Sequence, residues 1–365
     1  MIVDSTGYRI PYWLTKMGAA EAEQVAVAVQ EGRLSDGPIS RDFESNIAHA
    51  LDVPFATAVP SGSAGLLLAL LAVGVQPGDE VIVPAATWIA TANAAHILGA
   101  KVVLADTLRD RPLIDPAAVL NLITSKTKAV IAVHLGGRAA PVADLMKIAE
   151  RKGIYVIEDA CQALFSKNED GFLGTLGHIG CFSLSVSKLI NTGQGGMVVT
   201  GDEEIHNHMS RIKLNGVTSD GVTEVYHGPG FNFKYSDLKA AIGLVQLSSV
   251  ADKVQRVTDV YRTYRDRLQF CETVSVCPIN LEAGELPLWT EAEAKDVPKV
   301  QKILLGNQVE TRRFHTSLNH APHLEQVGRK FPNSEQHANS ILILPSGPSQ
   351  PLSNVERTCD LINAI

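Results

Sequence analysis

Two segments of the sequence carry residue types that could form a covalent cofactor site. Residues 158–162 read Glu-Asp-Ala-Cys-Gln, and Lys188 follows them, ahead of a glycine-rich turn at 192–196. Pyridoxal phosphate chemistry needs an amine that forms a Schiff base with the cofactor aldehyde. It also needs an acid that keeps the pyridine nitrogen protonated, so that the ring can accept electrons. Lys188 and Asp159 predict this amine and this acid, although an acid like Asp159 is also typical of a strand end that caps the next helix.

A third segment could hold the phosphate of such a cofactor. Residues 58–65 read Ala-Val-Pro-Ser-Gly-Ser-Ala-Gly and lead into an apolar stretch, 64–75, that predicts a buried helix. Free backbone N–H groups at a helix start bind anions, but Ser-Gly-Ser is also an ordinary N-cap loop. Trp88 either lies on the cofactor ring or packs in the core. The residues expected to hold the phosphate are Ser61, Gly62, Ser63 and Ala64.

The candidate cofactor-binding residues are far apart in the sequence, so the fold must bring them together at one edge of a sheet. Short β-branched runs alternate with helix-like stretches between residues 56 and 200, and the runs lie at 80–84, 101–106, 128–134, 154–159, 181–184 and 196–200. Continuous hydrophobicity is typical of strands covered on both faces, so the pattern predicts an α/β fold with a largely parallel sheet. Ligands bind beyond the carboxyl ends of such strands. Polar residues collect there, namely Asp106, His134, Asp159 and Ser183.

The character of the sequence changes after Ser236. One long helix is predicted from Asp237 to about Cys271, followed by short strands, an apolar run at 341–345 and a terminal helix that starts near Ser353. We interpret residues 251–365 as a smaller α+β domain and residues 1–250 as the large domain.

Composition excludes several classes of protein. With 365 residues, 45% of them apolar, the chain is long enough for about two domains and is not disordered. Its net charge of −7 predicts no nucleic-acid partner and no anionic membrane partner. The N-terminal residues lack a basic stretch followed by an apolar one, so we expect no secretory signal, and the sequence contains no apolar run of about 20 residues. Five cysteines without a Cys-x-x-Cys pattern predict neither a disulfide scaffold nor a metal site, so we expect a cytoplasmic protein.

The chain resembles the DegT/DnrJ/EryC1/StrS family of pyridoxal-phosphate-dependent sugar aminotransferases of fold type I. The resemblance runs from about residue 10 to 250 and continues faintly to 345. Its motifs lie at 61–66, 78–84, 87–88, 133–137, 158–162, 174–177, 182–183, 188, 192–196, 230–234 and 240–247. The resemblance implies a three-layer α/β/α domain with a large, mostly parallel sheet and a smaller C-terminal α+β domain.

The resemblance also implies roles for individual residues. Pyridoxal phosphate would be covalently bound to Lys188, which would also move a proton between the substrate and the cofactor. Asp159 would bind the pyridinium nitrogen, and Gln162 would contact the ring hydroxyl. Further contacts are expected from Ser183, Gly62 and Ser63 to the phosphate and from Trp88 to the ring face.

Asn232 matches a residue that in this family reaches the phosphate of the neighbouring subunit. A homodimer with a shared active site is therefore implied. Some positions depart from the family pattern, because Gln194 replaces a common Glu and Lys234 a common Arg. The tract 315–320, which would supply substrate contacts, matches only loosely.

Two further features have open interpretations. His134 is either a catalytic residue or a satisfied strand-end histidine. Arg312 and Arg313 either recognise a carboxylate or phosphate or form a solvated face.

The function predicted is transfer of an amino group from an amino acid, with glutamate expected, to a keto sugar. A nucleotide-linked keto-deoxysugar in cell-surface polysaccharide or secondary-metabolite biosynthesis is expected. Three alternatives stay open at this point. They are a cyclitol (scyllo-inosose-type) aminotransferase that uses glutamine, a sugar dehydratase of the same fold, and a pyridoxal-phosphate-binding regulator without turnover. Dehydratases of the family often carry His in place of the Schiff-base lysine, and the intact Lys188, Asp159 and Gln162 disfavour a regulator.

Overall fold

The computed structural model describes residues 9–219, 221–324, 326 and 328–365, and its centre is a seven-stranded sheet in the order β1-β9-β8-β5-β4-β2-β3. The strands are β1 (Phe55–Val59), β2 (Glu80–Pro84), β3 (Lys101–Ala105), β4 (Thr127–Val133), β5 (Tyr155–Asp159), β8 (Ile179–Ser183) and β9 (Gly196–Thr200). The pairings from β3 to β8 are parallel, and β9 is antiparallel to both of its neighbours. The prediction of an α/β fold with a largely parallel sheet is confirmed.

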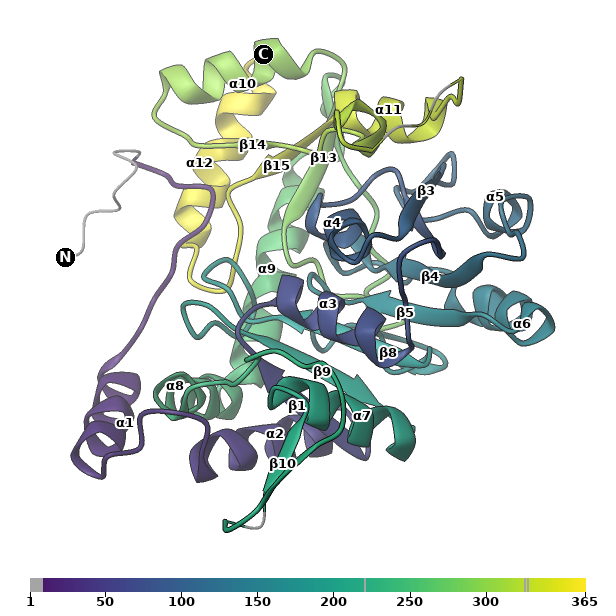
Figure 1. Cartoon of the computed structure of the whole chain (residues 1–365). Coiled ribbons are helices and arrows are strands. Elements are labelled where there is room, and N and C mark those ends of the chain that lie inside the picture. The colour runs from purple at the N-terminus through teal and green to yellow at the C-terminus, as the bar shows by residue number, and fades with distance from the viewer. Residues whose placement is uncertain (1–8, 220, 325, 327) are drawn as a thin grey trace.

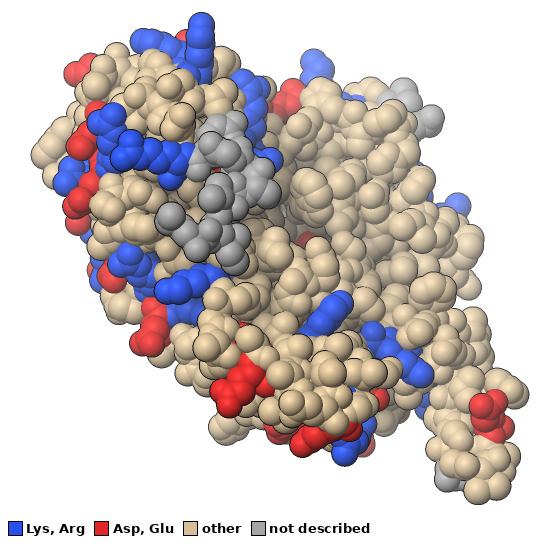
Figure 2. Space-filling model, turned by 90° about the vertical axis from the view of Figure 1, so that its left-hand side faces the viewer, with Lys and Arg blue, Asp and Glu red and all other residues tan. Residues whose placement is uncertain are grey.

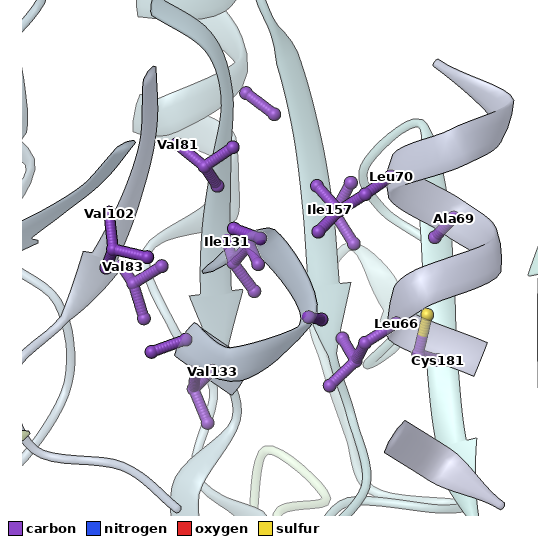
Figure 3. Packing of buried hydrophobic residues seen from close by; sticks show 14 of the residues in the cluster. Leu66, Ala69, Leu70, Val81, Val83, Val102, Ile131, Val133, Ile157 and Cys181 are labelled. Carbon is purple, nitrogen blue, oxygen red and sulfur yellow. The ribbon is translucent and has the colours of Figure 1, made fainter. Parts of the chain in front are cut away.

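Helices cover both faces of this sheet (Figure 1). One face carries α3 (Gly62–Ala72), α4 (Ala90–Ile97) and α7 (Glu203–Lys213), and the other carries α2 (Pro38–Ala50), α5 (Pro116–Leu120), α6 (Val142–Lys152) and α8 (Asp237–Ser248). Successive strand residues point to opposite faces of the sheet. Val81 therefore packs in the core on the α3 side, and Ile82 packs in the core on the α6 side. In Figure 3, Leu66 and Leu70 of α3 face Ile157 of β5.

The C-terminal part has its own antiparallel sheet in the order β12-β13-β15-β14. Its strands are β12 (Val274–Val276), β13 (Thr290–Ala294), β14 (Arg312–Arg313) and β15 (Ile341–Leu344). The accompanying helices are α9 (Val250–Arg267), α10 (Val297–Gly306), α11 (Pro332–Ser340) and α12 (Leu352–Asn363). The smaller α+β unit expected from the sequence is therefore present.

The prediction of one long helix after Ser236 is wrong. The helix is interrupted at Ser249, whose φ of −105° and ψ of 16° separate α8 from α9. The Ser248 hydroxyl donates to the carbonyl oxygen of Val245 (2.8 Å), and the Ser249 hydroxyl to that of Gln246 (3.2 Å). Such local hydrogen bonds compete with the helical ladder, which explains the break.

The N-terminal segment connects the two units. Helix α1 (Ala19–Gln30) packs against α8, whereas the residues before it run along the C-terminal unit (Figure 1). Ile10 forms a bridge with Val309, and Trp13 forms one with Ser346. Residues 1–8, where a secretory signal would begin, lie outside the described residues.

The remaining elements are short. They are the turns η1 (Leu135–Gly137) and η2 (Leu318–His320) and the hairpins β6 (Lys167–Asn168) with β7 (Gly171–Phe172) and β10 (Val217–Ser219) with β11 (Glu224–Tyr226). Among the helices that the structure describes, none has the length and apolarity needed to cross a membrane.

Candidate active site

A cavity of about 710 Å³ lies beyond the carboxyl ends of β5 and β8, where the C-terminal unit covers the sheet. Most of the residues predicted for the cofactor site line it, namely Ser61, Gly62, Ser63, Trp88, Asp159, Gln162, Ser183 and Lys188. Two predicted residues do not line the cavity: Ala64 is the third residue of α3, and Asn232 is exposed. The fold thus brings residues from four separate segments to one place.

Asp159 ends β5 and is held by two donors. Its Oδ2 accepts a hydrogen bond from the hydroxyl of Thr91 on α4 (2.7 Å), and its Oδ1 accepts one from the backbone N–H of Cys161 (3.2 Å). The Thr91 hydroxyl is in turn 3.1 Å from that of Thr87. Asp159 is only 5% exposed, so this network fixes the carboxylate at the cavity wall.

Lys188 follows β8, and its Nζ lies 4.6 Å from the centroid of the Trp289 ring. Burial lowers the pKa of the Lys188 amine, and electrostatic interactions with Cys161 and Asp159 partly oppose this shift. Because burial disfavours the charged form, the neutral and nucleophilic amine is more populated near neutral pH than in an exposed lysine.

The start of α3 offers anion donors. The Ser61 hydroxyl caps the helix by accepting from the N–H of Ala64 (3.1 Å), whereas the N–H groups of Gly62 and Ser63 have no acceptor within the described part of the chain. A Cβ on Gly62 would lie 3.1 Å from the Cβ of Ser183 and closer still to the Cys161 sulfur, so only glycine allows this approach. Two free N–H groups beside serine hydroxyls suit a phosphate.

Gln162 and Trp88 complete the predicted set. The Oε1 of Gln162 accepts from the N–H of Gly136 (2.9 Å), which leaves its amide NH₂ as a donor for a ligand. Trp88 is 58% exposed, and its ring centroid lies 5.6 Å from that of His315. An aromatic face this exposed at a cavity wall is available for stacking on a planar ring.

His134 is a satisfied strand-end histidine in this structure. Its Nδ1 accepts from the N–H of Ala140 (3.0 Å), so its Nε2 carries the proton and donates to Glu158 (2.7 Å). Glu158 also accepts from the N–H groups of Gly174, Leu176 and Gly177. Both side chains are fully buried, and together they hold the 174–177 loop rather than face the cavity.

Several lining residues were not selected from the sequence. Tyr12, Trp289 and His315 line the cavity, and burial together with the charge of Lys188 lowers the pKa of His315 to about 4. The guanidinium of Arg312 lies 4.7 Å from the centroid of the Tyr12 ring and 2.9 Å from Glu310. The sequence signals for this wall were the adjacent pair Arg312 and Arg313 and the loosely matching tract 315–320.

The arrangement fits pyridoxal phosphate. A buried amine, a fixed carboxylate, free N–H donors and an exposed aromatic ring are the groups that this cofactor requires, and they share one cavity. The amine is that of Lys188 and the carboxylate that of Asp159. The N–H donors lie at Gly62, and the aromatic ring is that of Trp88.

Comparison with known proteins agrees with this geometry. Residues 15–363 match the model of the DegT/DnrJ/EryC1/StrS aminotransferase family. The chain is 30% identical over 362 residues to GDP-perosamine synthase of Escherichia coli O157:H7, covering 97% of this chain and 98% of the relative. It is also 30% identical over 386 residues to the spore coat polysaccharide biosynthesis protein SpsC of Bacillus subtilis, covering 100% and 98%.

The fold is also shared with solved structures. The structure of S. venezuelae DesV in complex with a ketimine intermediate superposes with a TM-score of 0.92, at 26% identity and with 98% of each chain covered. A ketimine joins a cofactor amine to a keto compound, which is pyridoxal phosphate chemistry. With its matching site and fold, the chain belongs to the DegT/DnrJ/EryC1/StrS aminotransferase family and is an aminotransferase.

Proposed function

We propose that this aminotransferase moves an amino group from an amino acid, glutamate, to the carbonyl carbon of a nucleotide-linked keto sugar. The names of the two relatives, a GDP-sugar synthase and a polysaccharide biosynthesis protein, support a sugar as acceptor. The observation that carries the proposal is the single cavity that combines Lys188 and Asp159 with the two arginines of β14.

Most of the predicted residues have a role in this proposal. Pyridoxal phosphate, when bound, supplies a ring that takes up the electrons released as the substrate loses a proton. Lys188 is the covalent attachment point and afterwards holds and moves that proton at its Nζ. Asp159 keeps the ring nitrogen protonated, and the NH₂ of Gln162 donates to the ring oxygen. Ser183, Gly62 and Ser63 hold the phosphate.

The basic residues of β14 at the cavity wall are evidence for an anionic substrate. Arg312 and Arg313 both line the cavity, and Arg312 packs over Tyr12 while remaining half exposed. Guanidinium groups bind phosphates through paired donors. We assign this wall to the phosphates of the nucleotide, and Tyr12 to the edge of the same subsite.

The proposal includes a homodimer with a shared site. Asn232 is exposed and follows the β10–β11 hairpin, which extends away from the body of the molecule in Figure 1. Exposed apolar residues lie on and near that hairpin, among them Val225, Tyr226 and Phe231. Figure 2 shows a face with wide areas that carry no charged side chain. Such a surface suits a second copy, whose cofactor phosphate Asn232 would reach.

Two further expectations belong to this proposal. A cytoplasmic location is supported by the five cysteines, all of which are free thiols in the structure. The division into a cofactor domain (1–250) and a covering domain (251–365) stays a prediction, and α9 begins at Val250, close to that boundary.

A half-reaction screen tests the acceptor class. The protein is loaded with pyridoxal phosphate, converted to its aminated form with glutamate, and freed of the donor. Keto sugars, nucleotide-linked keto sugars and inososes are then added separately. The aldehyde form of the cofactor should return fastest with nucleotide-linked keto sugars. Return with inososes alone, or after conversion only by glutamine, would replace the proposal by cyclitol amination. Loss of a sugar hydroxyl without amino transfer would indicate a dehydratase, and no conversion with any donor would indicate a regulator.

A further inference from the structure

We propose that Trp289 is a positioning residue that holds the ε-amine of Lys188 over the face of its indole ring whenever the amine is not bonded to the cofactor. The inference rests on the proposed role of Lys188 but not on the identity of the sugar. Nothing in the sequence pattern predicts a role for Trp289, because that role follows from a contact between the residue preceding β13 and the loop after β8.

The contact has the geometry of a cation–π interaction. The Nζ of Lys188 lies 4.6 Å from the ring centroid of Trp289, inside the range of about 6 Å over which an ammonium is attracted to an indole face. Within the described part of the chain, this Nζ makes no hydrogen bond and no ion pair of its own. The indole face is therefore the contact that orients it.

The indole ring is well anchored. Trp289 is 8% exposed and directly precedes β13, which pairs with β12 and β15. Its neighbours in the apolar cluster are Trp13, Leu189, Val257, Leu288 and Ile343. A lysine side chain has many rotamers. Because its neighbours already hold the Trp289 ring in place, the ring can restrict the Lys188 side chain without first having to be ordered itself.

This positioning matters at one stage of the proposed reaction. If an amino donor displaced Lys188 from a bound cofactor, the freed amine would have to remain beside the carbon whose proton it moves. A mobile amine would spend much of its time outside that range, and proton transfer depends on a positioned base. The indole face keeps the released amine in the cavity.

The indole face also favours the charged form of the amine. Burial acts in the opposite direction, and the other titratable groups facing Lys188 are Asp159, Cys161 and His315. All three remain in place when Trp289 alone is replaced. A change in the titration of Lys188 therefore reports on the ring.

The test measures the pH dependence of Lys188 acylation in the full-length, cofactor-free chain. An amine-reactive ester is applied at a series of pH values, and mass spectrometry of the Lys188 peptide gives the midpoint of reactivity. We expect Trp289→Leu to lower this midpoint by about one pH unit, because the charged form loses its partner. Trp289→Phe keeps a weaker aromatic face, so its midpoint should lie between those of the wild-type chain and Trp289→Leu.

A matched control uses a second buried ring with a cation above it. The guanidinium of Arg329 lies 5.2 Å from the ring of Phe331, which is buried and does not line the cavity. Phe331→Leu should destabilise the fold but leave the Lys188 midpoint unchanged. If Trp289→Leu does not fold, Trp289→Phe still tests the direction of the shift.

A kinetic measurement completes the test. In single turnover with the amino donor, Trp289→Leu should slow conversion of the loaded protein about tenfold while donor affinity changes little, since only the amine is misplaced. An unchanged or raised midpoint in both Trp289 variants would overturn the proposal. The titration needs no sugar, so an error in the proposed acceptor would not affect its result. Failure of Lys188 to attach the cofactor would be detected by a different experiment, borohydride trapping of the loaded chain.

Discussion

The hydroxyl of Thr91 donates a hydrogen bond to Asp159, with 2.7 Å between Oγ1 and Oδ2. The two residues are on different elements, α4 and β5, and both are buried. The bond occupies one carboxylate oxygen and thereby fixes the direction in which the other can act. The acid expected to hold the ring nitrogen is thus oriented by a threonine.

Replacing Thr91 by valine should weaken cofactor binding. The change keeps the shape of the side chain but removes a donor to a buried carboxylate, which costs about 1–3 kcal/mol. We expect an affinity for pyridoxal phosphate at least about fivefold lower, measured by equilibrium titration. Thr358→Val is the control, because Thr358 is equally buried, its hydroxyl bonds to Asn354 and Tyr264, and it does not line the cavity. Equal affinities of the two variants for pyridoxal phosphate would show that the Thr91–Asp159 hydrogen bond does not contribute to cofactor binding.

Gly62→Ala should also impair phosphate binding. A Cβ at this position would lie 2.7 Å from the sulfur of Cys161, so α3 or Ser183 must move. Overpacking of this kind costs about 1–3 kcal/mol. Affinity for inorganic phosphate and for the cofactor should both fall about fivefold or more. Gly201→Ala is the matched control, because a Cβ at Gly201 would meet nothing within 4 Å. Phosphate affinity retained by Gly62→Ala would place the phosphate elsewhere.

The stability of the protein should depend on pH through His315. The unfolded chain takes up a proton at this residue below about pH 6.5, whereas the lowered pKa of about 4 keeps the folded imidazole neutral. The contribution to stability is therefore fully present above about pH 6.5 and is lost as the pH falls towards 4.

His315→Gln should remove this dependence. The loss of unfolding free energy between pH 7 and pH 4.5 should shrink by about 2 kcal/mol, less than full linkage because the imidazole is only partly shielded from solvent. Urea unfolding of the cofactor-free chain measures it, with the exposed His320→Gln as control. The same pH dependence in both variants would mean that His315 takes up its proton in the folded protein as readily as in the unfolded chain.

Subunit complementation tests the shared site. Lys188→Ala and Asn232→Ala should each be nearly inactive alone. In mixed dimers, one site would combine an intact Lys188 with the partner's Asn232, while the other would lack both. Random reassociation should therefore restore about a quarter of the wild-type activity. Activity no higher than that of the separate variants would assign each site to a single chain.

Local sequence patterns predicted the cofactor side of the molecule well. The strands at 80–84 and 196–200 have the predicted bounds, Asp159 ends β5 as expected, and Lys188 lies in the loop after β8. These features depend on residues close together in the chain. Strand ends and helix starts place Asp159 and Gly62 with little help from distant segments.

The features that the sequence did not predict depend on contacts between distant segments. Trp289 meets Lys188 only because β13 lies beside the loop after β8, and the Trp13 indole donates to the carbonyl oxygen of Val186 (3.0 Å) only because the N-terminal segment crosses between the units. No periodicity or capping signal records such pairings. The helix break at Ser249 was missed for a different reason, because serine pairs are also compatible with a continuous helix.

The central claim is that Lys188 carries the cofactor, and borohydride trapping tests it most directly. The chain is loaded with pyridoxal phosphate, reduced, digested and analysed by mass spectrometry, beside Lys188→Arg treated in the same way. The account predicts a stable pyridoxyl adduct on the peptide that contains Lys188 and none on the variant. An adduct on another lysine, or no adduct on the loaded wild-type chain, would contradict it.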